Sequence, residues 1–212
     1  MNFWENALTS SELRILQKLK TPFEIQNLLD EMSYPSGISY HCPLQVMRRK
    51  KAHCFDGAVL GAALLRLQGH PPLLVYMIAD NDDDHLIAPF KKHGHWGAVA
   101  KSNCVGLRFR EPIHRTMREL MMSYFEQFFN LHRKKSLRSY TSPLNLSTFD
   151  ADHWMIRNQA MEKISDQLDH QRVFRLLTSR MVRDLSPVDL KSYRSGFFGS
   201  NRRGLFRPVH EE

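Results

Sequence analysis

The sequence predicts a single α+β domain over residues 1–212, in which a buried helix packs on a small antiparallel sheet between N- and C-terminal helices. The segment over residues 54–67 is apolar on nearly every side, which is typical of a helix inside a fold. Two strand-like runs, residues 85–90 and 95–100, follow it and are separated by a short Gly-containing turn. The composition, 42% hydrophobic and 25% charged, is that of a globular domain with a core.

The chain opens with two predicted helices, each started by a capping box. In the first box Thr9 precedes Glu12 by three residues, and in the second Thr21 precedes Glu24. Pro22 stands at the first helical position of the second helix, where its missing N–H costs little. Apolar residues follow both boxes at helical spacing, so each helix is expected to pack one face on the core.

The centre of the chain holds the buried helix, a strand, an acidic loop and a hairpin. The helix is expected to begin near Cys54 and to end at Gly69, since glycine is favoured just past a helix end. The strand covers residues 73–78, and the acidic loop covers residues 80–84. The expected regions are the N-terminal helices at residues 1–40, the core at 41–110, a helical portion at 111–185 and a basic irregular tail at 186–212.

Positive charge gathers in the last part of the chain. From residue 171 onwards there are nine Lys or Arg against four Asp or Glu, within a net charge of +8 for the whole chain. A solvated basic surface is the plainer interpretation, and the alternative is a surface that engages an acidic protein or nucleic acid. No nucleic-acid-binding motif accompanies the basic residues, so nucleic acid is the less favoured partner.

The cellular setting is expected to be the cytoplasm. The first residues lack the basic and apolar regions of a signal peptide, and no apolar run is long enough to span a membrane. The three cysteines, Cys42, Cys54 and Cys104, are too few and odd in number for a disulfide framework, which fits free thiols in a reducing compartment. A membrane is therefore not expected as a partner, and the oligomeric state is open.

Cys54 is the first candidate for a reactive residue. A thiol at a helix N-terminus faces unpaired N–H groups and the positive end of the helix dipole, which favour the thiolate and can hold an oxyanion. His85 opens the first strand of the hairpin, where it could take the thiol proton and return it to a leaving amine. The alternative is that Cys54 is a small buried residue without chemistry.

These residues resemble a known superfamily. Residues 52–58 and 64–71 resemble the nucleophile helix of transglutaminase-like proteins, and residues 85–88 and 94–96 resemble their histidine and tryptophan strands. The resemblance covers about residues 40–105. From residue 96 through residue 120, the chain is also similar to a little-characterised bacterial subgroup of that superfamily.

The resemblance implies a papain-like cysteine fold with Cys54 as nucleophile and His85 as base and acid. It implies acyl transfer or amide and peptide hydrolysis on a protein, a peptide or a small amide, without a metal or organic cofactor. The second function class left open is a catalytically silent binding module on the same fold. That module would use the basic C-terminal region.

The third catalytic residue is where the chain departs from the family. The family places Asp about four residues after the tryptophan, and this chain has Ala100 there, followed by Ser102 and Asn103. One hairpin register puts Ser102 on the His85 face of the sheet, and a register shifted by one residue puts Asn103 there. Asn103 is preferred, because its carbonyl is the better acceptor for an imidazole N–H.

Other residues compete for these roles. His53 adjoins Cys54, but neighbours within a helix do not face each other. A metal site from His93, His95, His85 and the acidic loop matches no known spacing. Pro89 places the first hairpin strand at a sheet edge or a bulge. Further candidates are Asp80 and Asp84 as orienting groups, Gln45 for the oxyanion, and the arginines Arg108, Arg110, Arg115 and Arg118 for an acidic substrate group.

Overall fold

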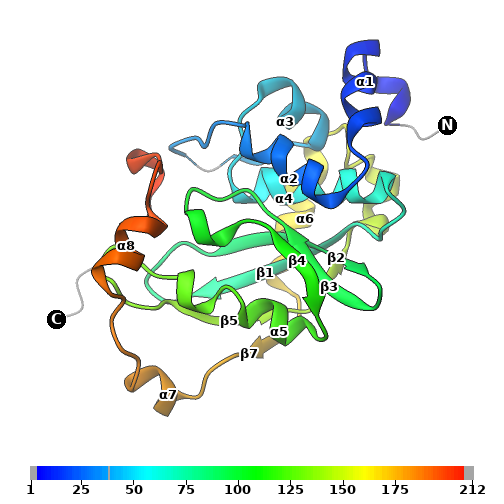
Figure 1. Ribbon diagram of the computed structural model, residues 1–212. Coiled ribbons are helices and arrows are strands. Elements are labelled where there is room, and N and C mark those ends of the chain that lie inside the picture. Colours follow the sequence, from blue (N-terminus) through cyan, green and yellow to red (C-terminus); the bar gives the residue numbers. More distant parts are fainter. Residues whose placement is uncertain (1–3, 38, 208–212) are drawn as a thin grey trace.

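The protein is a mixed α+β structure with an antiparallel sheet and helices on both faces. The structure, a computed structural model, describes residues 4–37 and 39–207 (Figure 1). Helices α1 (Ser10–Lys18) and α2 (Pro22–Asp30) begin with the two predicted capping boxes, both fully formed, which confirms these helix starts. A short helix that the sequence did not predict, α3 (Pro43–Arg49), precedes the buried one and has proline at its first position.

Helix α4 (Cys54–Leu67) is the centre of the fold and confirms the predicted buried helix. Every residue from Cys54 to Leu65 is buried. Its glycines allow close approach to the sheet: a Cβ at Gly61 would lie 2.8 Å from Val99, and one at Gly57 would lie 2.2 Å from Lys101. The small residues of α4 therefore set how near the helix lies to the hairpin.

The sheet has the strand order β4-β3-β2-β1-β5-β7, with β6 paired to β1, and all its pairs are antiparallel. Its strands are β1 (Leu73–Ala79), β2 (His85–Lys92), β3 (His95–Val99), β4 (Arg110–His114), β5 (Leu137–Thr141), β6 (Leu144–Asn145) and β7 (Val173–Arg175). The predicted strand at residues 73–78 and the predicted hairpin are thus β1, β2 and β3.

The hairpin register differs from both registers considered above. Phe90 pairs with Gly97, and the turn is only His93 and Gly94, with φ values of 48° and 80°. Two residues at positive φ form the tight hairpin turn that matches the twist of the strands. Extending this register would place Ser102 opposite His85, but β3 ends at Val99.

Pro89 lies inside β2, which is an internal strand of the sheet. The pairing of β2 with β1 ends at Ile87, two residues before the proline, so Pro89 has a ladder partner only in β3. The strand is therefore an edge locally, which is where a residue without an N–H is tolerated.

Two cores lie on the two faces of the sheet. Side chains alternate between faces along a strand. Leu86, Ala88 and Phe90 of β2 pack in the core that holds α2, α4 and α6 (Gln159–Asp169). Ile87 packs in the second core, which holds Leu120 and other residues of α5 (Met117–Met122). Figure 1 shows α4 above the strands and α5 below them.

The second half of the chain contains more strand and less helix than the sequence predicts. The portion expected to be helical, residues 111–185, contains only short helices. Helix α5 is followed by the 3-10 turn η3 (Phe125–Gln127), and α6 ends at Asp169 and gives way to β7. Strands β5 and β7 are short, and their hydrogen bonds come from distant neighbours, so local spacing does not reveal them. Other 3-10 turns are η1 (Glu5–Ala7), η2 (Val105–Leu107) and η4 (Leu146–Asp152).

The basic tail is partly ordered into short capped elements. Within residues 186–212 these are α8 (Leu190–Gly196) and η5 (Arg202–Gly204), capped by Asp189 and Asn201. Helix α7 (Ser179–Arg183), capped by Thr178, comes just before the tail. Residues 208–212 of the predicted tail lie outside the described part of the chain. In the part that is described, no helix has both the length and the apolarity needed to cross a bilayer.

Candidate functional site

Cys54 is the first residue of α4, and its side chain is buried. The preceding residue, His53, is the N-cap and has an extended backbone, with φ −77° and ψ 177°. No side chain caps the helix there. The thiol therefore lies at a helix start whose first N–H groups are not taken by a capping side chain, as the sequence predicts.

His53 is the imidazole that contacts the thiol. Its Nδ1 lies 3.2 Å from Cys54 Sγ. The expectation that the two neighbours would face apart is wrong, because His53 stands outside the helix and its extended backbone turns the ring back onto Cys54. The Tyr34 ring packs on it, with the two ring centroids 5.0 Å apart.

The charge environment keeps both partners neutral. Burial and the nearby Asp83 raise the pKa of the Cys54 thiol to about 12, against a smaller opposite effect of the Leu86 and Phe55 backbone N–H groups. Burial lowers the pKa of His53, which its attraction to Asp83 only partly offsets. At neutral pH the pair is thus a thiol beside a neutral imidazole, so a thiolate forms only if a base takes the proton.

His85 lies on the other face of the sheet from α4. It alternates with Leu86 along β2 and shares a face with Ile87, and its ring contacts Phe128 with the centroids 6.4 Å apart. Its Nε2 lies 2.8 Å from the Leu107 carbonyl oxygen, so Nε2 carries the hydrogen and donates it. Burial lowers the pKa of His85 to about 4. Among the described residues, His53 is the histidine whose ring lies within hydrogen-bond distance of the Cys54 thiol.

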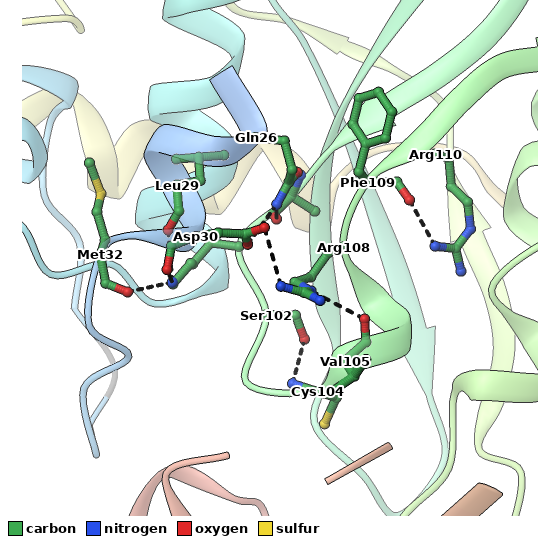
Figure 2. Close-up of polar contacts among 12 residues, drawn as sticks. Gln26, Leu29, Asp30, Met32, Ser102, Cys104, Val105, Arg108, Phe109 and Arg110 are labelled. Atoms are coloured by element: carbon green, nitrogen blue, oxygen red, sulfur yellow. Dashed lines mark hydrogen bonds and ion pairs between the residues drawn. The ribbon is translucent and has the colours of Figure 1, made fainter. Parts of the chain in front are cut away.

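The two predicted orienting residues have other partners. Asn103 exchanges two hydrogen bonds with the Asn201 backbone, at 2.9 Å and 2.8 Å. Ser102 Oγ accepts a hydrogen bond from the Cys104 N–H at 3.0 Å, and Figure 2 shows this contact. The group that orients His85 is instead the Leu107 carbonyl, which no side-chain pattern in the sequence could indicate.

Cys54 opens on a cavity of about 230 Å³ whose lining includes His53, Tyr40, Tyr76 and the acidic loop over residues 82–84. A smaller cavity of about 50 Å³ lies beside it and is lined by His85, Ser102 and Asn103. Residues 82–84 of the acidic loop line both cavities. Burial raises the pKa of Asp82 in this loop to about 6.

The remaining candidates are placed away from the thiol or have structural partners. Gln45 lies in α3 and does not line the Cys54 cavity. Asp84 accepts a hydrogen bond from the Ala79 N–H at 2.6 Å, and Asp80 pairs with Arg138 at 3.1 Å. His95 Nδ1 lies 2.9 Å from the His93 carbonyl oxygen. Within residues 4–37 and 39–207 no three His, Cys, Asp or Glu side chains are grouped as metal ligands.

Three of the four arginines after the hairpin, Arg108, Arg110 and Arg118, bind the protein's own backbone or acids. Arg110 stacks on Tyr124, 3.8 Å from its ring centroid, and donates to the Gly106 carbonyl at 2.7 Å. Arg118 donates to the Leu176 carbonyl at 2.7 Å. Arg108 pairs with Asp30 at 3.2 Å, and both side chains are labelled in Figure 2. These contacts hold β4, α5 and η2 in place.

The fold and the site together define an α+β protein with a buried Cys–His pair at the start of its central helix. A comparison with known protein families gives no match, and a comparison with curated proteins gives none either.

Proposed function

We propose that this protein is a thiol-dependent enzyme with a transglutaminase-like, papain-like fold that carries out acyl transfer or hydrolysis of an amide or peptide. Cys54 is its nucleophile. The observation that carries the proposal is the 3.2 Å contact between Cys54 Sγ and His53 Nδ1 at the N-terminus of α4, beside a cavity. A central helix followed by an antiparallel hairpin also agrees with the layout that the resemblance implies.

The chemistry proceeds in two halves. His53 Nδ1 takes the proton from the Cys54 thiol as the sulfur attacks the substrate carbonyl, and the N–H groups at the start of α4 hold the oxyanion. The C–N bond then breaks, and the imidazolium returns the proton to the departing amine, leaving an acyl thioester on Cys54. Water or an amine, deprotonated by the same imidazole, attacks the thioester and frees the thiol.

His85 is the base in the alternative version of this proposal. His85 lines a different cavity from Cys54 and is bonded to the Leu107 carbonyl, so this version requires its ring to leave that carbonyl and approach the thiol. Both versions have the same nucleophile and the same reaction. Variants of His53 and His85 show which of the two histidines takes the thiol proton.

Turnover with hydroxylamine as acyl acceptor tests the function. Glutamine-containing and other peptide amides are offered with hydroxylamine, and the hydroxamate product is measured. Cys54→Ser is expected to lower its formation by at least about 100-fold, because the hydroxyl is a far weaker nucleophile beside a neutral imidazole.

The matched control is Cys42→Ser. Cys42 is buried at the N-cap of α3, another helix start, but no imidazole bonds to its thiol in the described structure. This variant is expected to keep wild-type turnover. Turnover that survives in Cys54→Ser would overturn Cys54 as the nucleophile. A wild-type protein that turns over none of the amides would overturn the enzyme and favour the silent binding module.

A further inference from the structure

An arch of chain follows β7 and is tied to β5. The chain between Leu176 and Val188 leaves the sheet, forms α7 and returns. Its first end is fixed by the Leu176 N–H, which donates to the Arg138 carbonyl at 2.9 Å. Its second end is fixed by Val188 and Arg133, which exchange hydrogen bonds of 2.9 Å and 2.8 Å. Figure 1 shows α7 standing below β7 on this arch.

The arch and the start of β5 enclose a cavity of about 480 Å³. Four cationic side chains and one carboxylate line it: Lys134, Lys135, Arg138, Arg183 and Asp80. The arch also contributes an apolar wall, made of Val182, Leu185 and Pro187. A cavity of this size, with one apolar wall and convergent charges, is typical of a small-molecule site.

The charges in the cavity are only partly neutralised by the protein. Arg138 pairs with Asp80 at 3.1 Å, and Lys135 pairs with the exposed Glu126 at 2.6 Å. Arg183 projects from α7, is exposed, and has no hydrogen-bond or ion-pair partner among the described residues. Its planar guanidinium is therefore available to a ligand and matches phosphate oxygens in bidentate geometry.

We propose that this cavity binds an organic phosphate, with Arg183 and the Lys134–Arg138 segment holding the phosphate and the apolar wall covering the organic part. A dianionic phosphate offers Arg183 and its cationic neighbours more charge and more acceptor oxygens than a carboxylate does. The site is a hollow under an arch, which fits a small molecule better than the extended basic surface that follows a nucleic-acid backbone. This inference does not depend on the chemistry proposed for Cys54.

Titration of the full-length protein with inorganic phosphate and with a nucleoside monophosphate tests the site, with the unphosphorylated nucleoside as reference. The monophosphate is expected to bind at least 10-fold more tightly than the nucleoside. Arg183→Gln is expected to weaken its binding by at least 5-fold. The matched control is Arg180→Gln, since Arg180 is an exposed arginine of the same helix that does not line the cavity.

Three results would overturn the proposal. Equal weakening by Arg180→Gln would mean binding to general surface charge. Equal affinity for the nucleoside would mean that the phosphate is not recognised. Tighter binding of a single-stranded oligonucleotide, with a steep dependence on salt, would assign the basic residues to nucleic acid instead.

Discussion

Replacing Lys101 with methionine is expected to lower the free energy of unfolding by about 2–4 kcal/mol. The Lys101 side chain is buried, and its ammonium donates to the carbonyl oxygens of Leu29 and Met32, at the C-terminal end of α2. Figure 2 shows these two carbonyls converging on one nitrogen. Methionine keeps the apolar stem but leaves the helix carbonyls without their charged donor.

Urea unfolding measures this effect, and Lys92→Met is its control. Lys92 ends β2 as an exposed residue, so the same substitution there is expected to change stability by less than about 0.5 kcal/mol. A Lys101→Met variant as stable as the wild type would show that the hydrogen bonds of the ammonium only offset the cost of burying its charge. The stabilising role assigned to Lys101 would then be wrong.

Removing the imidazole of His53 is expected to slow alkylation of Cys54 by iodoacetamide at pH 7.5 by about 100-fold or more. With His53 in place, the thiol proton passes to Nδ1, so the rate should level off once the ring is neutral. In His53→Ala the thiol must ionise alone, and burial with Asp83 raises its pKa to about 12. The rate should then rise about tenfold for each pH unit between pH 7 and pH 10.

His85→Ala is the matched comparison. This variant loses the hydrogen bond to Leu107 and is expected to be less stable by about 1–3 kcal/mol, while the folded protein alkylates at a rate within a few-fold of the wild type. His53→Asn serves as a second variant if His53→Ala folds poorly. If His85→Ala is the slow variant and His53→Ala is not, the base is His85, as the sequence predicts, and the version with His53 is wrong.

The sequence predicted best what depends on local chemistry. The capping boxes at Thr9 and Thr21 need only residues three positions apart, so both helix starts were correct. The burial of α4 followed from an apolar surface on all sides. Placing Cys54 at the start of that helix needed no information from the rest of the chain.

What the sequence missed depends on contacts between distant segments or on one residue's backbone. The two-residue turn at His93 and Gly94 requires a positive φ at a histidine, which the sequence pattern does not indicate. The observed hairpin register therefore differs from the predicted ones. His53 was set aside because it was counted as part of the helix it precedes. The partner of His85 is a main-chain carbonyl, and Asn103 holds a segment about a hundred residues further along the chain.

The central claim, that Cys54 carries an acyl group during the reaction, is tested most directly by intact-mass analysis of the protein quenched in acid during turnover of a peptide amide. The expected result is a mass increase equal to the acyl group, mapped to Cys54 by peptide analysis and removed by hydroxylamine at neutral pH. An adduct on Cys42 or Cys104 in its place, or turnover of the amide without any adduct on Cys54 and undiminished in Cys54→Ser, would contradict the account.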